Sequence, residues 1–251
     1  MQRFSIAINL EPKAHHRIEQ NILRRRGVGL IGVDKDLVFP GYTLFAPLSS
    51  PNTVYLVDND GRKVHRWILP CPPGRHARIL FNGNLAFNGS LPDGPHLFLM
   101  WEKYRGGAML QVDPQGNIVR EHHDPLAHHD AHHLENGHIL YTTLEELSEN
   151  TGATVLGGVA GSEAPNARVY ADVIKDVDAD NNVIWTWKVS ENLPKDVFPL
   201  QSHYSREHWP LINTVYPLKD GNILASLRSV SVSSSLKRPL ARLSGIWITM
   251  L

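Results

Sequence analysis

Seven histidines lie within the nineteen residues from His122 to Leu140. An imidazole can bind a metal ion, exchange a proton near neutral pH, or attack an electrophile. Which of these the stretch can do depends on its conformation, because helix, strand and loop place different side chains together. The seven are His122, His123, His128, His129, His132, His133 and His138.

One spacing within this stretch resembles a zinc-binding helix. Three residues separate His129 from His133, and Asp130 stands where the HExxH motif has glutamate. That motif requires a helix, on which residues four apart share a face. Asn136-Gly137 follows within one turn and predicts a loop that leads into a strand. The sequence therefore argues against a metalloprotease helix.

The elements that would hold these histidines follow a repeated pattern. Three segments have an apolar strand that ends in Val-Asp, a short polar turn, and a second β-branched strand. Because Gly and Asn in the turns tolerate a positive φ, each segment is predicted to be an antiparallel hairpin. The three segments are Thr53–Leu69, Ala108–His122 and Ala171–Val189.

A second unit recurs between these hairpins. In it, Asn-Gly or Asp-Gly turns the chain into a short apolar strand. The units are Ile79–Gly89, His133–Thr143 and Tyr216–Arg228. Alternation of the two units predicts an all-β fold built as a β-propeller. A β-sandwich is the alternative, but it would not repeat this two-part order.

Composition limits the classes of function. With 25 basic and 25 acidic residues, the chain has no net charge that would favour nucleic acid. Cys71 is the only cysteine, so no internal disulfide is expected. No stretch approaches the ~20 apolar residues of a membrane span, and the N-terminus lacks a proper signal peptide. We expect a cytoplasmic chain with no nucleic-acid or membrane partner; its oligomeric state is not predicted.

Three parts can be distinguished along the chain. Residues 1–28 form an N-terminal segment, in which His15–Arg26 could form a short basic helix. Residues 29–235 carry the repeats and are predicted to form the propeller domain. Residues 236–251 form an aberrant tail.

This tail lacks the outer hairpin that the repeat requires after Ser226–Ser231. Pro239 and scattered arginines stand there instead. A reading-frame slip would explain the tail, since one legal back-translation from Leu236 onward, read in a shifted frame, encodes an acid, a Thr-Gly turn and Val-Ile-Trp. A genuinely divergent tail is the alternative.

Three segments resemble the bacterial aryl-sulfate sulfotransferase (ASST) family. They are Gly41–Trp67, His128–Tyr141 and His208–Ser231, and the resemblance extends over roughly Gly29–Ser231. It implies a six-bladed propeller that transfers a sulfuryl group from an aryl sulfate to a phenol without PAPS. We therefore expect a partial six-bladed β-propeller, with roughly its first three to four blades present and its closing blades missing. Family members can be periplasmic.

The resemblance also implies site residues. The family's His-Asp-x-x-x-Leu-x-Asn-Gly motif and its Ser-x-Arg element are matched by His129, Asp130, Leu134, Asn136, Gly137, Ser226 and Arg228. We expect His129 and Arg228 to be catalytic, and His128, Asp130 and Asn213 to bind substrate.

The chemistry of sulfuryl transfer explains these residue types. Negative charge on the sulfuryl oxygens suits the planar fork of arginine. A neutral imidazole can attack sulfur to give a sulfo-histidine, and another can exchange a proton with the phenol. This scheme requires neither a metal nor a cofactor.

Two departures from the family pattern stand out. Leu211 occupies the histidine position of the family's Trp-x-His-x-Asn element, and we expect His208 to substitute as a third catalytic residue. The family's sulfuryl-accepting histidine, which precedes an Asp-Asn-Gly run, has no match after Arg228. We therefore expect this chain to be inactive on its own.

Two other functions remain open at this stage. The first is a metal-binding propeller that holds zinc or copper through four histidines of the cluster, His128, His129, His132 and His133. The second is a non-catalytic propeller that binds a ligand or a partner through its channel.

Overall fold

The computed structural model describes residues 30, 32–47, 52–236 and 247–249. Strands account for 49% of the chain and helices for 9%, which confirms the all-β prediction. The predicted helix at His15–Arg26 lies outside the described residues. Among the helices described, none has the length and apolar character needed to cross a membrane.

Four antiparallel sheets follow one another along the chain and are numbered here in that order. Sheet 1 contains β1 (Tyr42–Phe45), β2 (Thr53–Asp58) and β3 (Lys63–Ile68). Sheet 2 contains β4 (Pro73–Ile79), β5 (Leu85–Ser90), β6 (Gly107–Val112) and β7 (Ile118–His123). Sheet 3 contains β8 (His128–His133), β9 (Ile139–Glu146), β11 (Tyr170–Val177) and β12 (Val183–Lys188), and β14 (His208–Trp209) runs parallel to β11. Sheet 4 contains β15 (Ile212–Pro217), β16 (Ile223–Leu227), β17 (Val232–Leu236) and β18 (Trp247–Thr249).

Short elements connect these sheets. A small parallel pair joins β10 (Gly157–Val159) to β13 (Leu200–Ser205). The described helical turns are α2 (Trp101–Tyr104), α3 (Glu149–Ala153), α4 (Val189–Asn192) and the 3-10 turns η1 (Pro165–Ala167) and η2 (Arg228–Val230).

The three predicted Val-Asp hairpins are confirmed. They are β2–β3, β6–β7 and β11–β12, each paired antiparallel. Their turns contain Gly61, Gly116 and Asn181, with φ values of 78°, 93° and 66°. Gly and Asn adopt this left-handed backbone at low cost, which is why these turns form where the sequence has them.

The second predicted unit is confirmed as well. It forms the hairpins β4–β5, β8–β9 and β15–β16. Gly83, Gly137 and Gly221 take φ values of 84°, 83° and 84° in the three turns. The same local chemistry thus gives the same bend in three sheets.

The histidine stretch is a strand, and the prediction of a loop was wrong. β8 pairs with β9, so that His128 lies opposite Thr142 and His133 opposite Ile139, with a register shift between His128 and Ala131. Histidine has no strong preference for strands; pairing with β9 and packing against β4 and β15 decide the conformation. A strand does not bring residues four apart together as a zinc helix does, so the metalloprotease interpretation fails for this second reason too.

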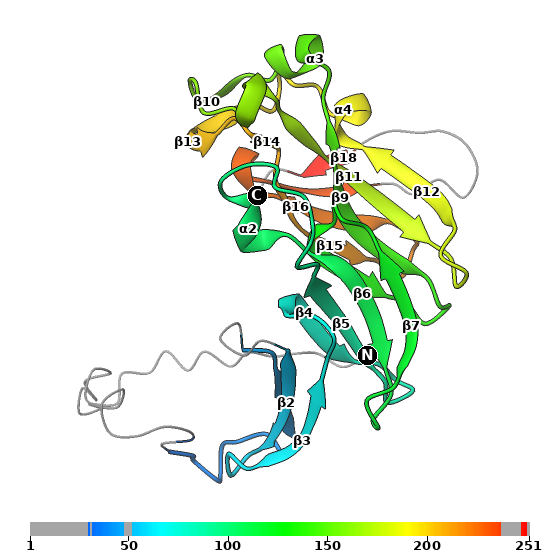
Figure 1. Ribbon diagram of the computed structural model, residues 1–251. Helices are drawn as coiled ribbons and strands as arrows, with labels where there is room; N and C mark the ends of the chain where they lie inside the picture. Colours follow the sequence, from blue (N-terminus) through cyan, green and yellow to red (C-terminus); the bar gives the residue numbers. More distant parts are fainter. Residues whose placement is uncertain (1–29, 31, 48–51, 237–246, 250–251) are drawn as a thin grey trace, which may run out of the picture.

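The first strand of sheet 3 lies against the first strands of sheets 2 and 4. β8 contacts both β4 and β15. Figure 1 shows sheets 1, 2 and 3 in succession along the molecule, with sheet 4 beside sheet 3. The largest apolar cluster joins sheets 3 and 4 and includes Leu140, Ile174, Ile212 and Ile223.

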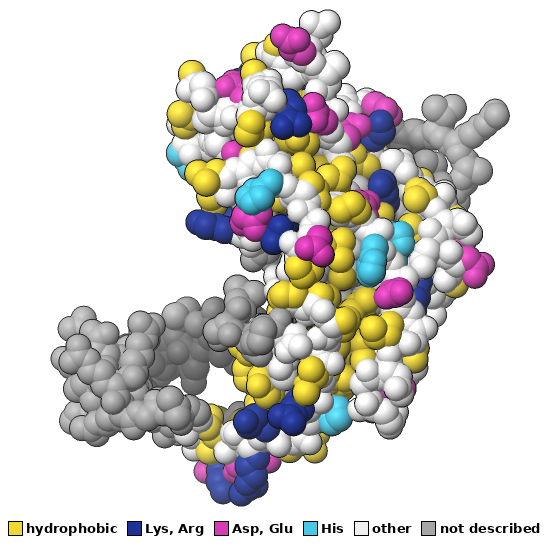
Figure 2. Space-filling model, in the orientation of Figure 1, with side chains coloured by type: hydrophobic (Ala, Val, Ile, Leu, Met, Phe, Trp, Pro, Cys, Tyr) yellow, Lys and Arg dark blue, Asp and Glu magenta, His cyan; other side chains and the backbone are white. Residues whose placement is uncertain are grey.

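Charged side chains are distributed over the surface in small groups. On the face drawn in Figure 2, Lys and Arg side chains lie near Asp and Glu side chains, with hydrophobic side chains between them. This mixing agrees with the equal totals of 25 basic and 25 acidic residues.

The chain after Ser231 supplies two strands of sheet 4. β17 pairs with β16, and Trp247–Thr249 pairs with β17. Residues 237–246 and 250–251 lie outside the described residues. The boundary placed at residue 236 and the reading-frame slip stay predictions.

Candidate active site

A pocket lies between sheet 2 and the start of β8. One wall comes from β5 and from the first residues of β6 together with the preceding Gly106. The other comes from the bulged part of β8 together with the preceding Ala127. The lining residues are Asn88, Gly106, Gly107, Ala108, Met109, Ala127, His128, His129, Asp130 and Ala131. Three of the predicted site residues, His128, His129 and Asp130, therefore lie side by side in the lining of one pocket.

The backbone at His129 is strained. Its φ is 40°, in the left-handed region that residues with a side chain rarely adopt. This residue lies within the register shift of β8, where His129 and Asp130 together interrupt the pairing with β9. Such bulges redirect a side chain and occur often beside active sites. The bulge thus explains how a histidine on a paired strand comes to line a pocket.

His129 is in contact with His128 through their ring nitrogens. The two Nδ1 atoms are 3.0 Å apart, and the ring planes are nearly perpendicular at 85°. On its other side, His128 directs Nε2 toward Asp172 Oδ1 at 3.0 Å and the carbonyl oxygen of Thr143 at 3.3 Å. Burial lowers the pKa of His128, and the neighbouring Asp172 offsets this only in part, so the ring is neutral near neutral pH.

Asp172 is the centre of a fully buried polar cluster. Its Oδ1 lies 3.1 Å from His208 Nε2, and its Oδ2 accepts a hydrogen bond from the backbone N–H of Ile212 at 3.0 Å. Burial by itself raises the pKa of Asp172, but attraction to His208 and the bonds from both imidazoles outweigh burial and hold this pKa well below its usual range. A carboxylate ion therefore sits in the core, stabilised by its partners.

The buried cluster has the residue types of a metal site. The ligand atoms of His128, Asp172 and His208 all lie within 4.8 Å of one another. However, the Thr143 carbonyl can only accept a hydrogen bond, so His128 Nε2 must carry a proton to donate to it. A protonated nitrogen has no lone pair for a metal. A metal bound through His128 Nε2 would have to displace this proton, so the hydrogen bond to Thr143 and metal binding by this nitrogen exclude each other.

The four histidines proposed as metal ligands do not converge. His132 Nε2 lies 3.3 Å from Asp130, and its ring is next to Tyr216 of sheet 4. His133 instead places Nδ1 3.2 Å from Gln111 of sheet 2. Successive side chains of a strand point to opposite faces, which separates these two rings. The alternative of a metal held by His128, His129, His132 and His133 is therefore not supported.

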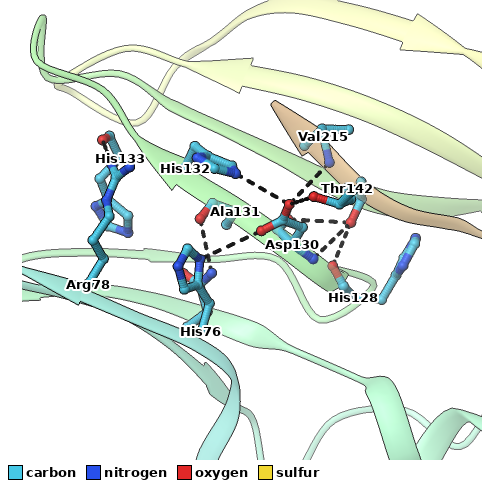
Figure 3. A network of polar contacts seen from close by, with 11 residues as sticks. His76, Arg78, His128, Asp130, Ala131, His132, His133, Thr142 and Val215 are labelled. Atoms are coloured by element: carbon cyan, nitrogen blue, oxygen red, sulfur yellow. Dashed lines mark hydrogen bonds and ion pairs between the residues drawn. The ribbon is translucent and has the colours of Figure 1, made fainter. Parts of the chain in front are cut away.

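Asp130 links three sheets, as Figure 3 shows. Its carboxylate accepts hydrogen bonds from the Thr214 hydroxyl and, at 3.1 Å, from the backbone N–H of Val215 in β15. It also lies 3.3 Å from His132 Nε2 and 3.7 Å from His76 Nδ1 of β4. Burial favours a raised pKa for Asp130, but the bonds from the two histidines and Thr214 lower it. These contacts show that Asp130 joins β8 to β15 and β4. The substrate-binding role of Asp130 stays a prediction.

Asp130→Ala is expected to lower the free energy of unfolding by about 2–4 kcal/mol, because it leaves several partly buried partners without their acceptor. Chemical denaturation monitored by circular dichroism measures this change. Asp93→Ala, at an exposed loop position, serves as the control and should change stability by less than about 0.5 kcal/mol. Equal stabilities of the two variants would show that the linkage is not stabilising.

The other predicted site residues lie outside the pocket lining. Arg228 is exposed at the start of η2, where its Nε donates to the Tyr204 hydroxyl at 3.2 Å. Among the described residues, no carboxylate pairs with Arg228. Asn213 is exposed on β15, whereas His208 is buried against Asp172. The His208 ring also lies directly beside the ring of His128, with centroids 5.2 Å apart.

Backbone bonds nevertheless connect these residues to the buried cluster. The Arg228 N–H donates to the carbonyl of Leu211 at 2.9 Å. The next residue, Ile212, is the one that donates to Asp172. Asn213 directly follows Ile212 in the chain, and Arg228 is hydrogen-bonded to the residue before Ile212, so both are connected to the cluster through the backbone.

Sequence analysis missed Asp172 and Thr143. Asp172 lies in the segment predicted as a hairpin strand, and only its acidic character in a mostly apolar strand marked it. Its partners, His128 and His208, are distant in sequence, so the contact could not be read from local spacing. Thr143 acts through its backbone carbonyl, for which side-chain type carries no signal.

The sequence profile of the arylsulfotransferase (ASST) family matches residues 41–235. The chain belongs to the arylsulfotransferase family. This match confirms the family to which the sequence motifs pointed, whose members act on aryl sulfates and phenols. No curated protein matches the chain significantly.

Among solved structures, the chain is similar to a protein of unknown function from Bacteroides caccae. The two share 14% sequence identity with a TM-score of 0.43. The similarity covers 82% of this ASST-family chain and 57% of the B. caccae chain.

Proposed function

We propose that the surface around His129, at the edge of this small pocket, binds the sulfuryl group of an aryl sulfate for transfer to a phenolic acceptor, without PAPS. The observation that carries this proposal is the strained, bulged backbone that places His129 in the lining of the pocket. Strain of this kind persists where the surrounding structure enforces it, and it is concentrated at functional sites. Membership of the ASST family supplies the substrate class.

We interpret the four sheets as consecutive blades of the six-bladed propeller that the resemblance implies. In this arrangement β4, β8 and β15 are the inner strands, since each is the first strand of its sheet and β8 contacts the other two. Inner strands of a propeller surround the central channel. Histidines on β8 would then face the same channel as residues from neighbouring blades.

Each residue of the proposed site has a different chemical role. His129 exchanges a proton at the phenolic oxygen and, when protonated, donates to a sulfuryl oxygen. Arg228 lies outside the pocket lining and has no carboxylate partner among the described residues, so its positive charge attracts the same anion without a direct contact in the pocket. His208 is too deeply buried to touch a ligand in the pocket, so it acts by holding Asp172 in its ionised form.

Binding of 4-nitrophenyl sulfate, measured by isothermal titration calorimetry, tests this function. His129→Gly is the informative variant, because glycine adopts a φ of 40° without strain and removes only the imidazole. We expect its affinity to fall about tenfold or more, as loss of a charge-assisted hydrogen bond predicts. Arg228→Gln should weaken binding by less than His129→Gly, because Arg228 lies outside the pocket lining, whereas Arg62→Gln, an exposed arginine in a turn of sheet 1, should leave the affinity unchanged.

Transfer to phenol is assayed in parallel by release of 4-nitrophenol. We expect binding without repeated turnover, because the sulfuryl-accepting histidine of the family pattern has no match in this sequence. Multiple turnovers would contradict that expectation but not the binding site. Binding that is unaffected by His129→Gly would contradict the site and would favour a ligand-binding propeller that uses another surface.

A further inference from the structure

The contact between His128 and His129 has a defined direction. A neutral imidazole carries one proton, on either Nδ1 or Nε2. His128 Nε2 faces two acceptors, the carbonyl oxygen of Thr143 at 3.3 Å and the Asp172 carboxylate at 3.0 Å. Neither of them can donate, so the proton of His128 is on Nε2. Its Nδ1 therefore has a lone pair.

The same reasoning extends to His129. The Nδ1 atoms of the two rings are 3.0 Å apart, a distance at which two lone pairs would repel each other. Because His128 Nδ1 has no proton, His129 Nδ1 must supply one. The proton of neutral His129 is then on Nδ1, and its lone pair is on Nε2, on the side of the ring away from His128.

We propose that His128 is a positioning residue that holds His129 in its Nδ1–H form, so that His129 exchanges a proton through Nε2. Thr143 and Asp172 enforce this arrangement from the core. The role in binding a phenol rests on the proposed function, whereas the assignment of the protons does not.

Burial makes this arrangement stable. The side chain of His128 and that of Asp172 are both 0% exposed, so water does not compete for their hydrogen bonds. The ring of Trp101 also lies against His128, with centroids 6.3 Å apart. The lowered pKa of His128 agrees with a ring that stays neutral, as the donor–acceptor order requires.

The consequence for a phenolic ligand is specific. The hydroxyl of a phenol can donate to His129 Nε2, and on full transfer its O–H bond breaks, the proton moves to Nε2 and the electron pair stays on oxygen. The imidazolium that results has a proton on Nε2 and can donate it to an anion. With the other tautomer, Nε2 could not accept the hydroxyl proton, and the site would lack a base.

Nuclear magnetic resonance of protein labelled with ¹⁵N-histidine tests the assignment directly. Long-range ¹H–¹⁵N correlation above neutral pH distinguishes the two tautomers, and His129→Gly identifies the His129 signals. We expect Nε2–H for His128 and Nδ1–H for His129 in the wild-type chain. An Nε2–H tautomer at His129 would overturn the proposal without any variant being needed.

His128→Phe removes the acceptor while it keeps a ring of similar size. We expect His129 then to populate the Nε2–H form and the affinity for phenol to fall about two- to tenfold. His133→Phe is the matched control, a buried histidine of the same strand that contacts Gln111, and it should preserve the His129 tautomer. Thermal unfolding checks that both variants are folded. If His128→Phe folds and His129 remains Nδ1–H, His128 does not set the tautomer.

These outcomes separate the two proposals. The expected tautomer in a chain that does not bind 4-nitrophenyl sulfate supports the positioning role and contradicts the proposed function. Binding of that ligand with His129 in the Nε2–H form supports the proposed function and contradicts the positioning role of His128.

Discussion

Replacing Asp172 with alanine is expected to lower the free energy of unfolding by about 3–5 kcal/mol. The carboxylate is fully buried and is in contact with His128, His208 and the backbone N–H of Ile212. Its removal leaves two buried imidazoles and one buried N–H that have lost their common acceptor. Because these groups come from β8, β11, β14 and β15, the loss affects the packing of sheet 3 against sheet 4. Chemical denaturation followed by tryptophan fluorescence measures the change.

Asp172→Asn is the matched variant. Its amide keeps the shape of the side chain and can still accept from Ile212, but it carries no charge. We expect a smaller loss than with alanine, and Asp180→Ala, at an exposed turn position, should be nearly neutral. An Asp172→Ala protein with wild-type stability would contradict the stabilising role of the cluster.

Acid is expected to destabilise the protein partly through His133. Burial first, and then the positive charges of Arg120 and Arg78, lower the pKa of His133 to about 3 from its ordinary value of 6.5. Above pH 6.5 this residue is neutral in both the folded and the unfolded state. As the pH falls from 6.5 toward 3, only the unfolded chain takes up the proton. Stability therefore decreases over this window, by up to about 4–5 kcal/mol for this group.

Comparison of His133→Gln with the wild-type chain isolates this effect. Glutamine does not titrate, so the free energy of unfolding should depend less steeply on pH between 6.5 and 4 in the variant. His203→Gln, an exposed histidine of β13, serves as the control and should keep the wild-type slope. Identical slopes for His133→Gln and the wild-type chain would show that His133 is not responsible.

Local sequence predicted the hairpins correctly because their causes are local. Gly61 and Gly137 stand in turns that require a positive φ, and the apolar residues beside them form the strands. The histidine stretch was predicted as a loop, since its composition has no strand signal. Pairing with β9 and contacts with β4 and β15 made it a strand, and these partners are set by tertiary packing.

The candidate site was predictable only in part. The motif around His129 identified a residue that does line a pocket, and the family match confirms the origin of that motif. Its connection to Asp172 was not visible, because residues distant in sequence meet only when β8, β11 and β14 are assembled. The same assembly separates His132 from His133 and so removes the apparent metal-binding spacing.

By itself, the sequence determined the all-β class, the positions of the six predicted hairpin turns and the family of the chain, since turn chemistry and motif order reside in neighbouring residues. Only the tertiary structure decided which nitrogen of His128 faces the Thr143 carbonyl and which acid lies beside it. Those features depend on the directions of buried donors and acceptors from separate strands, and such directions exist only after the sheets have packed together.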